Sequence, residues 1–256
     1  MIECRNICFS IGSSTLLHDI SWSFSPRKIT AILGANGAGK STFMRTLLGG
    51  LKPDSGSVEY QGKSLRQWSL QELALSRAYM AQSGNVRLGI SVLDYLLLAR
   101  VHRREDQAIS DRYVQDVIQT LALDSLVFKN IDELSGGEYQ RVELARAWSQ
   151  LVDENQLQNK LLLLDEPASA LDINQSQKLY HYLKHFVAAG GSVVVVEHDL
   201  NMAAKFCDEI ILLRDGECLA AGDKHGVFTE ANINSCFNVS GHLVRDENRN
   251  TVSFSL

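Results

Sequence analysis

A short apolar segment that runs directly into a glycine-rich loop and a helix constrains this sequence more than any other feature. The segment is KITAILG at 28–34, and the loop reads GANGAGKS from Gly34 to Ser41. It fits the pattern G-x-x-x-x-G-K-[ST] in the strand–loop–helix context that a phosphate-binding loop requires. Backbone N–H groups and the helix N-terminus bind phosphate in such loops. We therefore expect Lys40 to reach the phosphates and Ser41 to bind Mg²⁺. The context on both sides disfavours the alternative, a glycine turn with a solvated lysine.

A second apolar segment, LLLLDEP at 161–167, ends in two acidic residues. Asp165 stands where a buried strand would emerge, and the Asp at the corresponding place in phosphate-loop enzymes holds Mg²⁺. Glu166 follows directly and is placed to polarise a water molecule against the terminal phosphate as a general base. An acidic turn without chemistry is the alternative. The four preceding leucines and the phosphate loop elsewhere in the chain favour the catalytic interpretation.

Two further strands are predicted to end in a lone polar residue. RAYMAQ at 77–82 ends in Gln82, and VVVVEHD at 193–199 contains His198. Because ligands of open α/β sheets lie outside the carboxyl ends of the strands, these side chains would converge on the phosphate loop. Either residue alone is uninformative, since a single histidine is more often structural. Together they form a constellation in which Gln82 would sense Mg²⁺ or water and His198 would contact the terminal phosphate.

The order of the predicted elements indicates an α/β fold with a mostly parallel sheet and an inserted helical subdomain. Segments that are apolar on both faces, such as LLLL at 161–164 and VVVV at 193–196, are typical of parallel strands covered by helices. The N-terminal segments alternate and predict antiparallel strands, and EIILLRDGECLAAG predicts a hairpin across RDGE. The last thirty or so residues have no clear pattern. The predicted division is a nucleotide-binding core with an N-terminal β subdomain at 1–85 and 161–225, a helical subdomain at 86–160, and a C-terminal extension at 226–256.

The stretch LSGGE begins a helix with an unusual first turn. Ser135 as N-cap and Glu138 three residues later predict a capping box. Gly136 and Gly137 stand between them, although each glycine costs up to about 1 kcal/mol relative to alanine in a helix. The predicted helix that follows Ser69 has the same S-x-x-E pattern and no glycines. Capping alone therefore does not explain this sequence.

Composition limits the classes of partner. The 256 residues carry a net charge of −5, so the chain has no general attraction to nucleic acid or anionic lipid. No apolar run approaches the roughly 20 residues that span a bilayer, and the N-terminus lacks the pattern of a signal peptide. Membrane association would therefore need a partner.

GANGAGKS, Gln82, LSGGE, LLLLDEP, SALD and His198 occur in the order and approximate spacing found in ATP-binding-cassette (ABC) ATPases. The sequence resembles that family over roughly residues 1–225, and the combination is far more specific than any single motif. The resemblance implies a phosphate-loop ATPase that uses ATP and Mg²⁺ and pairs head to tail with a second copy. The LSGGE turn of each copy would close the ATP site of the other. Its glycines would let a terminal phosphate approach the N–H groups of the first helical turn.

The motifs and the resemblance together assign roles to three sets of residues. Catalysis is expected of Gln82, Glu166 and His198. Binding of Mg²⁺ is expected of Ser41, Gln82 and Asp165. ATP binding is expected of the phosphate loop with the start of its helix, of the LSGGE turn and of the acid in SALD: Gly34, Ala35, Asn36, Gly37, Ala38, Gly39, Lys40, Ser41, Thr42, Ser135, Gly136, Gly137, Glu138 and Asp172.

Adenine recognition departs from the family pattern. The family commonly stacks adenine on an aromatic residue in the N-terminal strand region, about where Ile11 falls in this chain. Phe9 lies two residues earlier and would either stack on adenine instead or pack in the core. The motifs therefore define phosphate recognition better than base recognition.

One cassette without a membrane-spanning segment leaves three hypotheses. They are the ATPase subunit of an importer, a soluble ATPase of translation or DNA repair, and a nucleotide-dependent interaction module without turnover. The resemblance implies two cassettes for the translation type and long coiled coils for the repair type, and this chain has neither. Glu166 with His198 disfavours an inactive module. We therefore expect an importer subunit, bound peripherally at the cytoplasmic face of the inner membrane.

Several stretches resemble the branch of the family that serves iron chelates, haem and vitamin B12. The pattern W-S-x-x-E-L-A-x-x-R-A at 68–78 and the polar insert before LLLLDEP favour haem, with vitamin B12 and ferric siderophores as alternatives. The resemblance implies three partners: a second copy of the chain, integral-membrane permease subunits and, indirectly, a substrate-binding protein. The segment 83–98 is the expected permease contact, with subdomain core as the alternative.

Overall fold

The computed structural model describes residues 2–82, 88–246 and 251–255 and divides into two compact units. The first unit comprises Met1–Trp68 and Val193–Leu256, and the second comprises Ser69–Ser192. The phosphate loop belongs to the first unit, whereas LSGGE and LLLLDEP belong to the second. The predicted helical subdomain falls inside the range of the second unit.

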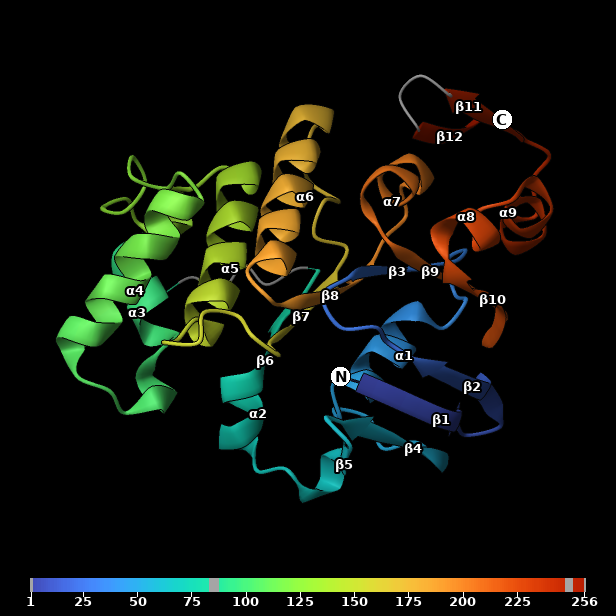
Figure 1. The fold of residues 1–256 in the computed structure, drawn as a ribbon, viewed down its shortest axis with the longest axis horizontal. Helices are drawn as coiled ribbons and strands as arrows, with labels where there is room; N and C mark the ends of the chain where they lie inside the picture. The colour runs from blue at the N-terminus through green and yellow to red at the C-terminus, as the bar shows by residue number, and fades with distance from the viewer. Residues whose placement is uncertain (1, 83–87, 247–250, 256) are drawn as a thin grey trace. The chain divides into compact units, whose positions relative to one another are not determined.

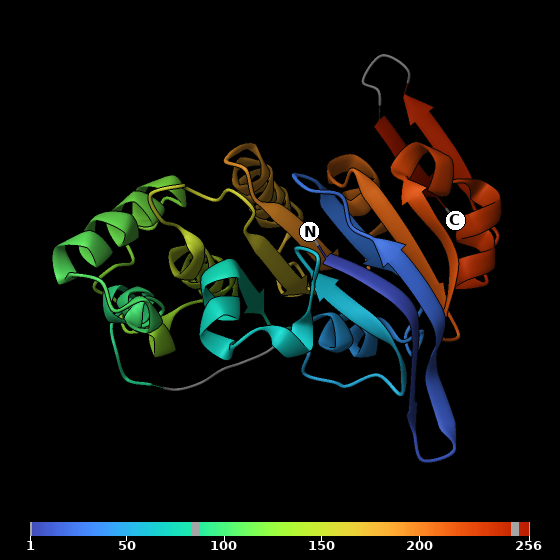
Figure 2. The ribbon, with the colours of Figure 1, turned by 60° about the horizontal axis from the view of Figure 1, so that its bottom comes forward.

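The N-terminal strands of the first unit form the predicted antiparallel sheet, in the order β2-β1-β4-β5. Their bounds are β1 Ile2–Ile11, β2 Ser14–Ser23, β4 Ser55–Tyr60 and β5 Lys63–Ser64. Figure 2 shows β1 and β2, in blue, as a long hairpin with β4 beside it. Ile2, Cys4 and Ile7 of β1 are buried, and a register shift between Cys4 and Ile7 accounts for the break in their alternation.

The strand before the phosphate loop lies in a second sheet. β3 (Ile29–Leu33) pairs in parallel with both β8 (Ser192–Val196) and β9 (Glu209–Arg214). Every residue of β3 and β8 is buried, as expected for parallel strands covered on both faces. β9 returns as β10 (Glu217–Asp223) in the one antiparallel pair described for this sheet. The predicted α/β class with a mostly parallel sheet is thus confirmed.

The predicted hairpin across RDGE is also confirmed, and its turn has a defined backbone geometry. Asp215 and Gly216 both have positive φ, at 50° and 81°. Two successive positive φ values belong to the type I′ turn, whose twist matches that of the flanking strands. The Asp-Gly dipeptide is the sequence signal for this turn.

The remaining elements of the first unit are mostly helical. They are α1 (Lys40–Leu47), the 3₁₀ turn η1 (Leu65–Gln67), α7 (Leu200–Phe206), α8 (Lys224–Val227), α9 (Glu230–Phe237), β11 (His242–Asp246) and β12 (Thr251–Ser255). The elements after Asp223 belong to the stretch without a clear sequence pattern. Phe254 N donates to Asn201 Oδ1 at 2.8 Å, so the β11–β12 hairpin is attached to α7.

The second unit combines two parallel strands with a group of helices. β6 (Arg77–Met80) pairs in parallel with β7 (Leu161–Asp165). The helices and 3₁₀ turns are α2 (Leu70–Ser76), α3 (Val92–Leu98), η2 (Val101–Arg103), α4 (Gln107–Thr120), η3 (Ile131–Glu133), α5 (Gly136–Leu151) and α6 (Ile173–Ala188). Figure 1 shows α3 and α4 beside α5, which confirms the predicted helical insertion. Among the described residues, no helix has the length and apolar character needed to cross a membrane.

Candidate active site

The phosphate loop leaves the carboxyl end of β3 and enters α1, as its motif predicts. Gly39 is the N-cap of α1 and has a φ of 96°, a region that residues with a side chain rarely adopt. A Cβ at this position would lie 2.8 Å from the carbonyl oxygen of Leu16 in β2. Because the N-cap is glycine, it has no side chain to bond the first N–H groups of α1. An anion can bind these groups where a capping side chain would otherwise lie.

The Lys40 side chain folds back into the loop. Its Nζ donates to the carbonyl oxygens of Gly34 at 2.8 Å and Ala35 at 3.0 Å, and the residue is only 6% exposed. Ser41, the next residue of α1, is exposed. The ammonium group therefore lies on the inner side of the loop. This placement matches the motif, in which the lysine reaches phosphates held by the loop.

The turn between β9 and β10 holds the phosphate loop in place. Gly216 N donates to Ala38 O at 3.2 Å, and Gly216 O accepts a hydrogen bond from His18 N at 2.8 Å. The turn thus connects the loop to β2 through backbone hydrogen bonds. A loop that is already ordered in this way loses less conformational entropy when it binds an anion.

His198 follows the strand next to the phosphate loop. β3 and β8 are parallel neighbours with Ile32 opposite Val196, so both chains leave the sheet at the same edge. Glu197 is buried, and its Oε1 accepts hydrogen bonds from His198 N at 2.8 Å and from Asp199 N at 3.0 Å. The His198 residue itself is exposed. The first unit therefore brings the predicted histidine to the edge from which the phosphate loop emerges.

The second unit brings Gln82 and Glu166 into direct contact. β6 and β7 are parallel neighbours with Met80 opposite Leu164, so their carboxyl ends also share an edge. Gln82 Nε2 donates a hydrogen bond to Glu166 Oε2. This hydrogen bond from the Gln82 amide restrains the orientation of the Glu166 carboxylate. A general base needs a fixed orientation toward the proton that it accepts.

Asp165 is held at the end of β7 by a residue that the sequence argument did not identify. Asp165 is 5% exposed, and its Oδ2 accepts a hydrogen bond from the Tyr79 hydroxyl at 3.4 Å. The Tyr79 carbonyl oxygen accepts in turn from Arg146 Nη2 of α5 at 2.9 Å. The sequence offers only a weak signal for this role of Tyr79. Its hydroxyl group could bond many partners, and Asp165 becomes the partner only once β6 pairs with β7.

Glu166 has a backbone conformation that its residue type disfavours. Its φ is 50°, in the left-handed region. This region costs roughly 1–2 kcal/mol for a residue with a Cβ, and residues held in it are concentrated at functional sites. Ser169 N donates to Glu166 O at 3.2 Å and closes the turn. The side chain of Glu166 is therefore directed by a strained turn at the end of β7.

The predicted capping box at the start of α5 is confirmed. Glu138 Oε2 accepts hydrogen bonds from Ser135 N at 2.9 Å and from the Ser135 hydroxyl at 2.8 Å. Lys129 Nζ lies 3.0 Å from Glu138 Oε1. The Ser135 groups and then Lys129 lower the pKa of Glu138 to about 2. The predicted capping box of Ser69 and Glu72 at α2 is confirmed as well.

The two glycines of the LSGGE turn have different surroundings. A Cβ on Gly136 would meet nothing closer than the Ala170 Cβ at 4.0 Å. A Cβ on Gly137 would lie 2.2 Å from Gln175 Oε1 of α6. Gly136 thus faces open space, as the predicted phosphate contact requires, whereas a side chain at Gly137 would displace the flexible amide end of the exposed Gln175. Gln175 carries no motif, and only the packing of α6 against α5 reveals its role.

Asp172 lies close to the LSGGE turn within the second unit. It is the N-cap of α6, and its Oδ1 accepts from Gln175 N at 2.8 Å. A cavity of about 210 Å³ opens between α5 and α6, and its lining extends from the first to the third turn of each helix. Its polar lining comes from both helices: Glu138, Arg141, Asp172, Asn174, Gln175, Lys178 and Tyr182. SALD and LSGGE are thus neighbours in space.

The residues considered for adenine lie on β1 in the first unit. Ile11 is 63% exposed at the end of the strand. Phe9 pairs with Leu17 of β2 and is partly exposed. A partly exposed Phe9 keeps both interpretations open, and its stacking on adenine stays a prediction.

Comparisons with known proteins agree with this geometry. The family model described as ABC transporter matches residues 17–169. The chain is 39% identical over 246 residues to the hemin import ATP-binding protein HmuV of Methylobacillus flagellatus, covering 93% of this chain and 90% of that protein. It is 36% identical over 248 residues to the protein of the same name from Escherichia coli O157:H7, covering 96% and 95%.

A solved structure supports the fold independently. The dimeric structure of a bacterial ABC transporter cassette superposes with a TM-score of 0.75 and 25% sequence identity. The match covers 87% of this chain and 98% of that cassette. The two units described above therefore have the architecture of an ATP-binding cassette.

The matched capping boxes of α2 and α5 provide a test of the LSGGE turn. Ser69→Ala and Ser135→Ala should each lower the free energy of unfolding by about 1 kcal/mol, because each removes an N-cap. We expect only Ser135→Ala to reduce ATP hydrolysis as well. Chemical denaturation and steady-state phosphate release would measure the two effects, and equal activity in both variants would refute a role for Ser135 beyond capping.

The two glycines can be separated by substitution. Gly136→Ala fits the space available and should leave the free energy of unfolding unchanged or raise it by up to about 1 kcal/mol, yet sharply reduce ATP hydrolysis. Gly137→Ala should disturb Gln175, and the double variant Gly137→Ala with Gln175→Ala should relieve that clash. Thermal unfolding and phosphate release would be measured for all three. Full activity in the double variant would mean that Gly137 serves only the contact with α6.

Proposed function

Because this chain belongs to the ABC transporter family of ATPases, we propose that it binds and hydrolyses ATP to energise the import of haem through a separate membrane permease. The observation that carries the reaction is the contact of Gln82 with Glu166 at the ends of two parallel strands. Haem as cargo is supported by two relatives named for hemin import, which are 39% and 36% identical over 90% and 95% of their lengths.

The chemistry of the available donors fits ATP together with Mg²⁺. The N-terminus of α1 and the Lys40 ammonium group suit phosphate. The Ser41 hydroxyl, the Gln82 amide oxygen and the Asp165 carboxylate are oxygen ligands of the kind that Mg²⁺ takes. We infer that these three residues would hold the ion. When bound, Mg²⁺ neutralises charge on the phosphates.

Glu166 is the proposed general base. Its carboxylate would accept a proton from the attacking water as the new bond to the terminal phosphorus forms and the bond from that phosphorus to the bridging oxygen breaks, which releases ADP. Gln82 restrains the direction of this carboxylate. His198 would contact the terminal phosphate, and its position beside the phosphate loop supports this role. The strained backbone of Glu166 supports a functional position over a merely structural one.

A second copy of the chain is the proposed partner that completes each ATP site, head to tail. The open space at Gly136 supports this assembly, because a terminal phosphate can approach the first turn of α5 there. The dimeric state of the similar cassette supports it further. Asp172 is the proposed link between the two sites, and its position as the N-cap of α6 beside the LSGGE turn supports this role.

The proposed membrane partner is a pair of permease subunits, through which a substrate-binding protein would act. This places the chain peripherally at the cytoplasmic face of the inner membrane. Of the expected permease contact at 83–98, residues 83–87 lie outside the described residues, and the exposed Leu98 supports an apolar contact at its other end. Vitamin B12 and ferric siderophores are the alternative cargoes, and a soluble ATPase outside transport is the more distant alternative.

Substitution of the proposed base separates hydrolysis from binding. Glu166→Gln keeps the shape of the side chain but cannot take a proton, so steady-state turnover should fall by about two to four orders of magnitude. ATP should still bind and trap a dimer, which size-exclusion chromatography with ATP would detect. Lys40→Ala is the control, because it should weaken ATP binding itself. Retained hydrolysis in Glu166→Gln would remove Glu166 from the mechanism.

The cargo can be identified with the complete transporter. The chain would be co-expressed with its native permease and binding protein, reconstituted in liposomes and assayed for phosphate release. We expect the haem-loaded binding protein to stimulate hydrolysis. Stimulation by vitamin B12 or a ferric siderophore in place of haem would overturn the cargo while leaving the ATPase role intact.

A further inference from the structure

We propose that Arg100 and Arg103 are positioning residues for ATP hydrolysis. They hold the C-terminal end of α5 and thereby fix the position of the LSGGE turn at its other end. The inference rests on the proposed role of that turn in the ATP site of a second copy. Neither arginine belongs to any of the nucleotide motifs.

The two guanidinium groups bond the carbonyl groups at the end of α5. Together they donate to four successive carbonyl oxygens: Ser149, Gln150, Leu151 and Val152. Arg100 Nη1 donates to the first and to the last of these, the last at 2.9 Å. Arg103 donates from Nε and Nη2 to the middle two, at 3.0 and 2.8 Å.

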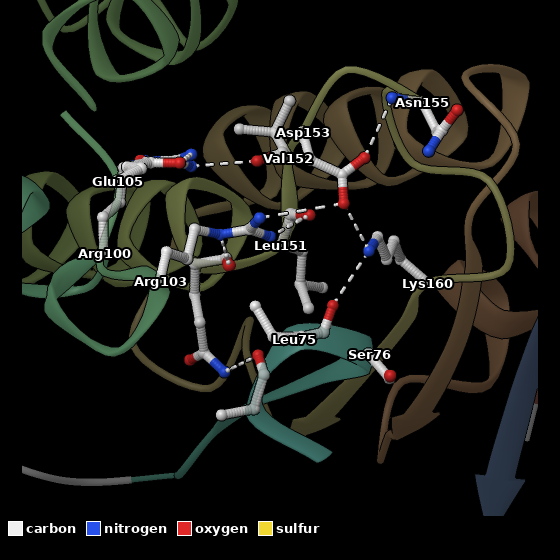
Figure 3. Close-up of polar contacts among 12 residues, drawn as sticks. Leu75, Ser76, Arg100, Arg103, Glu105, Leu151, Val152, Asp153, Asn155 and Lys160 are labelled. Atoms are coloured by element: carbon white, nitrogen blue, oxygen red, sulfur yellow. Dashed lines mark hydrogen bonds and ion pairs between the residues drawn. The ribbon is translucent and has the colours of Figure 1, made fainter. Parts of the chain in front are cut away.

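The end of a helix leaves such carbonyl groups without hydrogen-bond partners inside the helix. Cations at this end also interact favourably with the helix dipole. Figure 3 shows both side chains directed at the same helix end.

Arg100 is locked in a single geometry. Its side chain is fully buried, and it forms a two-point ion pair with Glu105, from Nε to Oε1 at 2.6 Å and from Nη2 to Oε2 at 3.0 Å. The Ser110 hydroxyl donates to the same Oε1 at 2.7 Å, and the guanidinium lies 4.7 Å from the centre of the Tyr113 ring. Because removal of Arg100 would leave Glu105 partly buried without its partner, this position mixes effects on folding with effects on activity.

Arg103 is the better position for a test, although its side chain is only 8% exposed, because its removal leaves Asp153 paired with a second cation, Lys160. Its Nη1 lies 3.7 Å from Asp153 Oδ2 in the polar insert before β7. Lys160, at the other end of that insert, lies 2.6 Å from the same oxygen and donates to Leu75 O of α2 at 2.9 Å. Among the described residues, the Lys160 ammonium group bonds α2 and Asp153 but none of the four α5 carbonyls. It therefore offers a matched control within one network.

The bonds at the C-terminus act on the LSGGE turn because α5 is a continuous helix. Its 16 residues span about 24 Å at about 1.5 Å per residue. Apolar packing of Val142 and Leu144 restrains the helix sideways. The carbonyl groups of a helix point along its axis, so the four hydrogen bonds restrain it lengthwise. A lengthwise shift of about 1 Å in groups that position a substrate can cost up to about a hundredfold in rate.

The experiment compares Arg103→Gln with Lys160→Gln in the full chain. Both should lower the melting temperature. Arg103→Gln should also lower kcat for ATP hydrolysis by between about tenfold and a hundredfold, with nucleotide affinity unchanged in a titration with a fluorescent ATP analogue. Lys160→Gln should leave kcat unchanged. Arg103→Lys keeps the positive charge but loses the planar fork that reaches two carbonyl groups, and it should recover part of the lost kcat.

If Arg103→Gln and Lys160→Gln lower kcat alike, in step with their melting temperatures, the arginines are only structural and the inference fails. Gly136→Val serves as the reference for the LSGGE turn itself. If it lowers kcat while Arg103→Gln does not, the inference alone is overturned. If neither lowers kcat, the proposed function of the LSGGE turn fails as well.

Discussion

Fully buried strands limit the positions at which this chain can carry polar functional groups. β3, β7 and β8 are each five residues long and buried throughout. A charged group in the middle of such a strand would lose its hydration at a cost of several kcal/mol. Polar groups consequently appear where the strands end: the phosphate loop after β3, Asp165 at the end of β7, and His198 after β8. Parallel pairing brings neighbouring ends to one edge within each unit, so the location of the site follows from burial.

The ends of the helices separate phosphate-binding turns from ordinary ones. α2 and α5 begin with the same capping box, yet only α5 has a glycine that faces open space in its first turn. α1 begins at a glycine N-cap, which leaves its first N–H groups to an anion. At the C-terminus of α5, by contrast, the backbone groups already have partners, because two arginines donate hydrogen bonds to its last carbonyl oxygens. One end of this helix is thus kept accessible while the other is tied to the rest of the second unit.

Much of the fold and of the candidate site was predictable because the signals are local. A capping box depends on residues three apart, and Ser135 with Glu138 forms the one expected. The RDGE turn depends on a dipeptide, and its geometry is the expected one. Gln82 and Glu166 were each predictable as polar residues that follow apolar strands. Their contact follows from the pairing of β6 with β7.

The sequence by itself determined which backbone segments are buried, which turns carry glycine and which polar residues end the strands. Those properties arise from a residue and its near neighbours along the chain. Only the tertiary structure decided that Gln175 lies where a Gly137 side chain would be, and that Tyr79 bonds Asp165. It also decided that Arg100 and Arg103 hold the end of α5. Each of these contacts joins segments far apart in sequence, and long polar side chains have no periodicity that reveals their partners. Such contacts exist only after the strands and helices have packed.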